Sequence, residues 1–325
     1  MNLKPYEVKH WQNIQSYMNY TDRAFFAMIA RITKIYDQVP SGVPFDLNNL
    51  PGIKRAIELE LRKLAQEINS GIVNGINREW ALSNAKNDIV TSAALRGRKL
   101  PSAVADRWNG RNLDALSAFQ KQNINGLTLS GRVWNIIQGQ SVLIEQQMAL
   151  GIKNGTSASS LATEMKQYLN NPNALFRRVR DEAGDLKLSQ VALKYNPGQG
   201  VYRSAYKNAL RLTRTETNRA YQKADAVRWK KQDFVIGVRV QRSAVPYPCD
   251  ICDAGVGLYP KDYEWDLWHP NCRCNATPEL APDSEIDSAI NDILDGKEPE
   301  FSGYVEEIPR EMQDLQEKGF VHYGH

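Results

Sequence analysis

All four cysteines of this 325-residue chain lie within one stretch that also holds one of its four histidines. Cys249 and Cys252 form a C-x2-C pair, and after sixteen further residues come His269, Cys272 and Cys274. Cysteines placed only for burial would scatter along a chain, whereas two short groups of donors facing one another are typical of a tetrahedral zinc site. We therefore predict a bound Zn²⁺. The alternatives are free buried thiols or a disulfide formed under oxidising conditions.

Five donors compete for about four coordination positions. Cys249, Cys252, His269 and Cys272 form two similar pairs and are our first choice. Cys274 can replace His269 or Cys272, because alternate residues of an extended segment point in opposite directions. A site filled by four protein donors leaves no position for water, so we expect a structural site rather than a catalytic one.

The length and composition of the whole chain limit the class of protein to which it can belong. Its length predicts about two domains, and its 42% hydrophobic and 24% charged residues are typical of a soluble globular protein. No run of 18 apolar residues occurs, so we expect no transmembrane helix. The first seven residues lack the apolar core of a signal peptide. We expect a reducing cytosol, which favours a metal over a disulfide.

Residues 1–95 are predicted to form a helical region. Apolar residues recur every three or four positions from 8 to 39 and from 53 to 95, which indicates an antiparallel helical hairpin. Gly71 and Gly75 are expected weak points of the second helix. Residues 96–129 are predicted to be a basic connector with one short helix at 113–119, and further helices are predicted at 130–154 and 158–169.

Two basic features follow. A small hairpin is predicted at about 175–189, with three arginines on its first limb. A long helix is predicted at 202–231, and four basic residues near its start fall within about 80° of one another. We predict contact with a polyanion or an acidic partner, with a solvated surface as the alternative. The candidate contact residues are Arg177, Arg178, Arg180, Arg203, Lys207, Arg211 and Arg214.

Glu216 lies on the opposite, largely apolar side of the same helix. A buried carboxylate is costly unless it is paired, so we predict a structural ion pair with an arginine or bonds from backbone donors. A general base is the alternative, but the sequence places no second acid, histidine or nucleophile beside it.

Residues 234–241 read as the clearest strand, and they lead into the cysteine cluster. The predicted fold class is α+β, mainly α: long N-terminal helices and then a helical domain closed by a small antiparallel sheet with the zinc-like site.

Residues 279–325 carry 13 acidic and 3 basic residues, whereas the rest of the chain carries 24 acidic and 38 basic residues. We expect this acidic tail to compete with polyanions for the basic surface, with a tail that only solubilises the protein as the alternative. One amphipathic helix is predicted at 284–294, and the remainder orders on a partner.

The segment Arg214-Thr215-Glu216-Thr217-Asn218-Arg219-Ala220, a strand, a cysteine-containing segment with Gly257, and His269-Pro270-Asn271-Cys272-Arg273-Cys274 occur in this order. In this order they resemble the phage head morphogenesis family, the Mu F-like minor head proteins, over about residues 130–278. We therefore predict that the chain divides into four segments: a helical region at 1–95, the connector at 96–129, the Mu F-like domain at 130–278 and the acidic tail at 279–325.

The resemblance implies a minor structural head protein of a tailed phage or prophage, without enzymatic activity. Its implied partners are the portal protein, major capsid or scaffold components, and double-stranded DNA, with no membrane. Its implied place is the head interior or portal vertex of the virion, after assembly in the host cytoplasm. Its implied role is head assembly and DNA packaging or delivery.

Three other functions compete with this reading. Pro248 and the C-x2-C pair match half of a zinc-deaminase signature, but the upstream H-x-E half is missing, because His10 is followed by Trp11 and Gln12. A metal-dependent nuclease needs an open metal position or a free general base. A zinc-ribbon nucleic-acid-binding protein acting outside a virion is the third alternative.

Overall fold

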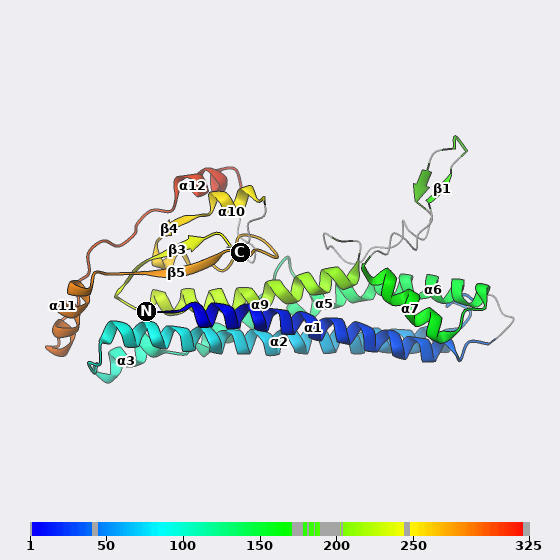
Figure 1. The fold of residues 1–325 in the computed structure, drawn as a ribbon, viewed down its shortest axis with the longest axis horizontal. Coiled ribbons are helices and arrows are strands. Elements are labelled where there is room, and N and C mark those ends of the chain that lie inside the picture. Colours follow the sequence, from blue (N-terminus) through cyan, green and yellow to red (C-terminus); the bar gives the residue numbers. More distant parts are fainter. Residues whose placement is uncertain are drawn as a thin grey trace. The chain divides into compact units, whose positions relative to one another are not determined.

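The computed structural model describes residues 2–40, 45–170, 178–180, 182–184, 186–188, 202, 204–243 and 248–320. Helices dominate, and none of those described has the length and apolar character needed to cross a bilayer (Figure 1). The helices are α1 Lys4–Tyr36, α2 Pro51–Leu95, α3 Ser102–Asn109, α4 Leu113–Lys121, α5 Leu129–Gln138, α6 Gln140–Asn154, α7 Ala158–Asn170, α9 Ala205–Lys230, α10 Asp250–Ala254, α11 Asp283–Leu294 and α12 Arg310–Glu317, with a 3-10 turn η2 at Lys261–Tyr263.

The chain groups into two compact units, each built from separate stretches of sequence. Unit 1 comprises Met1–Gln15, Asn74–Gln122 and Thr215–His325, and unit 2 comprises Ser16–Val73 and Asn123–Arg214. The helices α1, α2 and α9 each contribute residues to both units. The four linear segments predicted from the sequence stay a prediction.

The antiparallel pairing of α1 with α2 forms the core of unit 2. Arg31 of α1 pairs with Glu60 and Glu67 of α2, whereas the earlier Tyr20 lies against the later Gly71. A methyl group at Gly71 would lie 2.6 Å from the Tyr20 ring, so this glycine permits a close helix approach. Helix α2 runs unbroken through Gly71 and Gly75, and at Gly71 the close packing outweighs the low helix propensity. The apolar stripes that meet include Phe25, Ile29, Ile32, Leu61, Leu64, Ile68 and Ile72, all at most 2% exposed.

Three further helices, a hairpin and the first part of α9 complete the described part of unit 2. The single helix predicted at 130–154 is wrong: Gly139 ends α5, and α6 begins at the next residue. Thr128 caps α5 by accepting a 3.2 Å hydrogen bond from the Gly131 amide. The predicted hairpin is present as the antiparallel pair β1 Arg178–Arg180 and β2 Leu186–Leu188.

The predicted connector contains two helices in unit 1 rather than one. The helix α3 was missed because it is only eight residues long, with Val104 and Trp108 as its main apolar residues. Trp108 is fully buried, and its indole nitrogen donates a 3.0 Å hydrogen bond to Asp233. Tertiary packing therefore supports a helix whose local periodicity is weak.

A three-stranded antiparallel sheet lies in unit 1, in the order β4-β3-β5. The strands are β3 Val235–Gln241, β4 Gly257–Tyr259 and β5 Asn275–Leu280. In the register, Val240 faces Gly257 on one side and Ala276 on the other. The predicted α+β, mainly helical class with a small antiparallel sheet is confirmed. The central strand β3 connects α9 to the segment that carries the first cysteine pair.

The acidic end of the chain contributes to the core of unit 1. Strand β5 continues past residue 278, and α11 follows, as predicted. The expectation that the remainder orders only on a partner is wrong for residues 310–317, which form α12. Ile290 of α11 and Met312 of α12 are fully buried in the same core as Trp268 and Cys252. An acidic composition therefore coexists with a few well-placed apolar anchors.

Candidate metal centre

Two short irregular segments of unit 1 bring the five predicted donors together. Cys249 is the residue before α10 and has an extended backbone, while Cys252 lies within α10. The second group lies on the turn that leads into β5, where the Cys272 amide donates a 3.1 Å hydrogen bond to the His269 carbonyl. Both groups are therefore held by tight local turns whose ends continue into the sheet.

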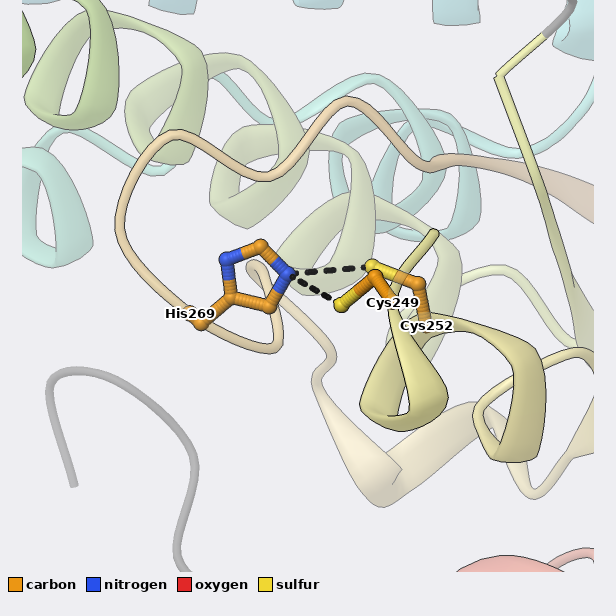
Figure 2. A group of neighbouring side chains, drawn as sticks. All are labelled: Cys249, Cys252 and His269. Carbon is orange, nitrogen blue, oxygen red and sulfur yellow. Dashed lines mark hydrogen bonds between the residues drawn. The ribbon is translucent and has the colours of Figure 1, made fainter. Parts of the chain in front are cut away.

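The donor atoms are close enough to share an ion. The His269 Nε2 atom lies 3.2 Å from Cys249 Sγ and 3.1 Å from Cys252 Sγ (Figure 2). Cys252 Sγ lies 3.7 Å from Cys272 Sγ. Adjacent sulfurs of a tetrahedral site with Zn–S bonds of about 2.3 Å are about 3.8 Å apart. All four cysteines are free thiols, so none is committed to a disulfide.

The donors form two overlapping triads. Cys249, Cys252 and His269 make the first, and Cys252, Cys272 and Cys274 make the second, with all donor atoms of a triad within 4.8 Å of one another. Cys252, Cys272 and Cys274 are buried, whereas Cys249 and His269 are partly exposed. The cluster can hold a metal ion, and Cys252 is common to both arrangements.

The position of His269 fixes its tautomer. Its Nδ1 atom lies 3.0 Å from the Pro270 carbonyl oxygen, which can only accept a hydrogen bond. Nδ1 therefore carries the proton, and the Nε2 lone pair faces the cysteine thiols. A ligating histidine commonly donates its second ring nitrogen to a carbonyl in this way.

Without a cation, the surroundings of Cys249, Cys272 and Cys274 favour their protonated thiols, because the pKa of each is raised. Hydrogen bonding to Cys252, together with burial, raises the pKa of Cys272 to about 12. Hydrogen bonding to Cys252 and Cys272 raises the pKa of Cys274, and burial raises the pKa of Cys249. A bound divalent cation reverses this preference, because it stabilises the deprotonated thiolates. The cluster is therefore compatible with two states: thiolates that bind a cation, or neutral thiols without one.

Side chains of α9 and of Arg242 hold the backbone of the two donor segments. Asn218 of α9 donates a 3.1 Å hydrogen bond to the Cys272 carbonyl, and the Asn271 amide donates a 2.9 Å bond to Thr215 Oγ1. Asn271 has a left-handed backbone with φ 67°, which asparagine tolerates. Arg242, just after β3, donates a 3.1 Å bond to the Cys249 carbonyl. The ligand segments are thus attached to the framework independently of any metal.

Glu216 is buried beside an arginine. It is 1% exposed, and its Oε2 lies 3.5 Å from Nη1 of Arg219, one turn further along α9. Arg219 also bonds Asp266 at 2.6 Å, immediately before the second donor group. This geometry is that of the predicted structural ion pair.

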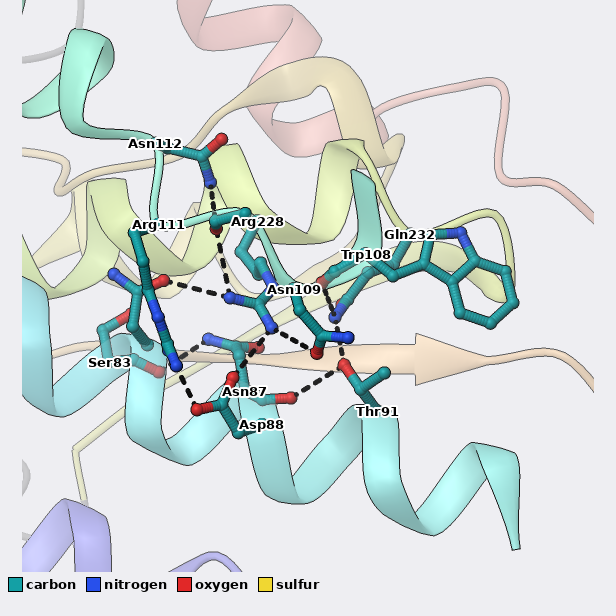
Figure 3. A network of polar contacts seen from close by, with 12 residues as sticks. Ser83, Asn87, Asp88, Thr91, Trp108, Asn109, Arg111, Asn112, Arg228 and Gln232 are labelled. Atoms are coloured by element: carbon teal, nitrogen blue, oxygen red, sulfur yellow. Dashed lines mark hydrogen bonds and ion pairs between the residues drawn. The ribbon is translucent and has the colours of Figure 1, made fainter. Parts of the chain in front are cut away.

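A further buried polar network centres on Arg228 near the end of α9. Its guanidinium donates to the Asn84 side chain and the Gly110 carbonyl, both at 3.1 Å, and to Asp88 at 2.9 Å (Figure 3). Burial lowers the pKa of Arg228. The network joins α2, the α3–α4 junction and α9 within unit 1.

The basic contact residues are only partly described. Lys207, Arg211 and Arg214 lie on α9 and are half-buried rather than fully solvated. Arg178 and Arg180 lie in β1, where only the backbone is described. Arg177 and Arg203 lie outside the described residues. The predicted polyanion contact stays a prediction.

A pocket of about 460 Å³ lies in unit 1 between α4, α9 and the segment before the second donor group. Its lining includes Lys223, Lys230 and Lys231 but none of the five Cys/His donors. Glu264 pairs with Lys223 at 2.8 Å and with Lys230 at 2.7 Å, so much of this positive charge is compensated.

Sequence reasoning did not assign a role to His10 or Asn218. Both are fully buried, and their ring and amide atoms lie 3.0 Å apart despite 208 residues of separation. A histidine at the start of an amphipathic helix gives no local sign of such a partner.

Comparison of the chain with protein-family models, curated proteins and solved structures finds no match.

Proposed function

We propose that the Cys/His cluster binds Zn²⁺ as a structural ion. The observations in support are a sulfur–sulfur separation of 3.7 Å, close to a tetrahedral edge, and a histidine whose Nε2 lone pair faces the thiols. When bound, the ion supplies a cross-link between the α10 segment and the turn before β5. The protein's own residues orient the donors: Pro270 fixes the histidine tautomer, and Asn218 and Thr215 of α9 hold the second segment.

We propose further that the protein is a minor head protein of a tailed phage or prophage, associated with the portal and acting by contact rather than catalysis. One observation carries this proposal: the two motifs behind the family resemblance are bonded directly to each other. Asn218 of the first motif bonds the Cys272 carbonyl, and Thr215 accepts from the Asn271 amide. Direct packing of the two motifs supports a shared structural role for them in this protein.

The test is quantitative mass spectrometry of particles purified from the source phage or induced prophage. A few copies per particle, in a fixed ratio to the portal protein, is the expected result. Absence from particles together with abundance in the lysate would overturn the proposal. Steep salt-dependent DNA binding without cleavage would then favour the nucleic-acid-binding alternative, and metal-dependent cleavage would favour the nuclease.

Zinc content is tested separately by elemental analysis of protein purified without added metal. About one zinc per chain is expected, with loss on treatment with a chelator. A Cys252→Ser variant provides the matched comparison, because this residue belongs to both donor triads. A wild-type protein that contains no metal and takes up none would overturn the zinc proposal while leaving the head-protein proposal standing.

A further inference from the structure

A continuous path of buried hydrogen bonds joins the first turns of α1 to the metal centre within unit 1. His10 Nδ1 lies 2.6 Å from Glu79 Oε2 of α2, and His10 Nε2 lies 3.0 Å from Asn218 Oδ1 of α9. Asn218 Nδ2 then donates to the Cys272 carbonyl at 3.1 Å. All four residues are fully buried, so water cannot substitute for a broken link.

The path also fixes where one proton lies. A backbone carbonyl only accepts, so the Asn218 amide nitrogen must face Cys272 and its oxygen must face His10. His10 Nε2 therefore carries a proton and donates it to Asn218. On the other side of the ring, Nδ1 lies 2.6 Å from Oε2 of the Glu79 carboxylate. Each group in the path has one defined role, which makes the arrangement specific.

Other contacts hold the same face of α1. The His10 ring stacks on Tyr221 of α9 with centroids 4.1 Å apart and 17° between the planes. The Tyr221 hydroxyl donates to Glu7 at 2.9 Å, and Asn13 donates to Glu79 at 2.9 Å. Glu7, His10 and Asn13 recur every three residues, so one face of the segment is docked by polar and aromatic contacts.

We propose that the metal centre and residues 4–15 of α1 are thermodynamically coupled through His10 and Asn218. This inference rests on the metal binding put forward above. The bound ion restrains the turn that runs from His269 to Cys274, and the Cys272 carbonyl of this turn orients Asn218, which in turn orients His10. Breaking any of these hydrogen bonds leaves a buried polar group without its partner, which costs free energy. Order at the metal centre therefore stabilises residues 4–15 in their docked position, and the docked segment stabilises the metal centre. By reciprocity, a partner that displaces the N-terminal segment weakens metal retention by the same factor.

Hydrogen exchange measured by mass spectrometry tests the coupling in the full-length protein. The protein is compared when loaded with Zn²⁺ and after removal of zinc with EDTA. We expect exchange of residues 4–15 to accelerate at least about fivefold on zinc removal, the lower end of typical coupling. The helix α6 in unit 2 serves as the internal reference. Unchanged exchange at 4–15, with zinc shown to bind and to leave, would overturn the coupling alone.

An Asn218→Leu variant tests the path directly, because it removes both hydrogen bonds at similar side-chain volume. We expect it to lose zinc to the chelator at least about fivefold faster than the wild type, and its exchange at 4–15 to become insensitive to zinc. Asn208→Leu is the matched control: Asn208 is also buried on α9, but it bonds the Tyr202 backbone in unit 2. Equal zinc loss from the Asn218→Leu variant and the wild type contradicts the proposal.

Nitrogen NMR of His10 provides a measurement that needs no variant. In the zinc-loaded wild type, Nε2 is expected to show a bound, slowly exchanging proton, and removal of zinc is expected to speed that exchange. An unprotonated Nε2 would overturn the path even if Asn218→Leu failed to fold. A protein without any zinc uptake would instead remove the zinc proposal on which the coupling rests.

Discussion

At the scale of single residues, Cys252 has the most connected position in the donor cluster. Its Sγ lies 3.1 Å from His269 Nε2 and 3.7 Å from Cys272 Sγ, and it is the one member common to both triads. The other four donors compete for three remaining positions of a tetrahedral site. If the proposed zinc ion is bound, one of them is therefore spare, and substitution can identify it.

Serine substitution of each cysteine and alanine substitution of His269 separate ligands from the spare donor. We expect Cys252→Ser to abolish stoichiometric zinc binding, and three of the other four variants to weaken it by at least about tenfold. The remaining variant should bind zinc like the wild type. Zinc content and competition with a chromogenic chelator measure these outcomes, and full zinc binding by Cys252→Ser would contradict the assignment.

Gly255 follows α10 and lies directly against Trp268. A methyl group at this position would lie 2.4 Å from two atoms of the indole, which is fully enclosed in the core. We expect Gly255→Ala to lower the free energy of unfolding by about 1–3 kcal/mol, because the packed ring cannot move away. Urea denaturation measures the change. Gly52→Ala is the control, since nothing lies within 4 Å of that site and the free energy should not fall.

At the scale of helices and strands, α12 shows how a short, highly polar segment becomes part of a core. Met312 is its one buried side chain and is fully enclosed. We expect Met312→Ala to destabilise the fold by about 2–5 kcal/mol and Asp314→Ala, on the exposed face, to change it by less than about 0.5 kcal/mol. Urea denaturation compares the two. Equal effects would show that α12 is not anchored by this residue.

The segment between η2 and the second donor group is tied to α9 by Glu264. Burial opposes ionisation of this carboxyl, but hydrogen bonds from Lys223 and Lys230 lower its pKa from the ordinary value of 4.5. A carboxyl with a lower pKa in the folded protein stabilises the fold above its unfolded pKa and loses that contribution as the pH falls. The stabilisation should therefore be complete at pH 7 and decline below about pH 4.5.

Glu264→Gln tests this dependence. The free energy of unfolding of the wild type should exceed that of the variant by about 0.5–1 kcal/mol at pH 7. This difference should shrink as the pH falls below about 4.5. Urea denaturation at a series of pH values gives the comparison. Glu298→Gln, an exposed site without an ion pair among the described contacts, should show no such trend. A difference independent of pH would rule out the lysine pairs as its cause.

Long periodic elements could be predicted from the sequence, whereas contacts between distant residues could not. The spacing of Ile57, Leu61 and Leu64 predicts α2, and the run Val235–Gln241 predicts β3, because a buried face leaves a regular pattern. The helix α3 and the break at Gly139 depend on tertiary packing. For the site, spacing identified all five donors, but the bonds of Asn218 and His10 depend on the folded arrangement of three helices.

At the scale of the whole molecule, charge is divided between the ends of the sequence. Residues 1–278 contain 38 basic and 24 acidic residues, and residues 279–325 contain 3 and 13. Some of these opposite charges form ion pairs inside unit 1, where Arg98 pairs with Asp287 and Arg96 pairs with both Asp283 and Asp287. Between α11 and α12, however, four exposed glutamates have no ion pair among the described contacts: Glu298, Glu300, Glu306 and Glu307. These are the acids that we expect to compete with an external polyanion.

Changing these four glutamates to glutamine should strengthen binding to double-stranded DNA, because it removes four negative charges without disturbing Ile290 or Met312 in the core. We expect at least about threefold tighter binding at 50 mM salt and a smaller gain at 200 mM, since screening weakens repulsion between exposed charges. Fluorescence anisotropy with a short duplex measures both affinities. Lys207→Glu combined with Arg211→Glu, on the half-buried face of α9, should weaken binding in either background. If the glutamine variant gained nothing while the α9 variant lost affinity, DNA would contact the basic body without competition from the acidic end.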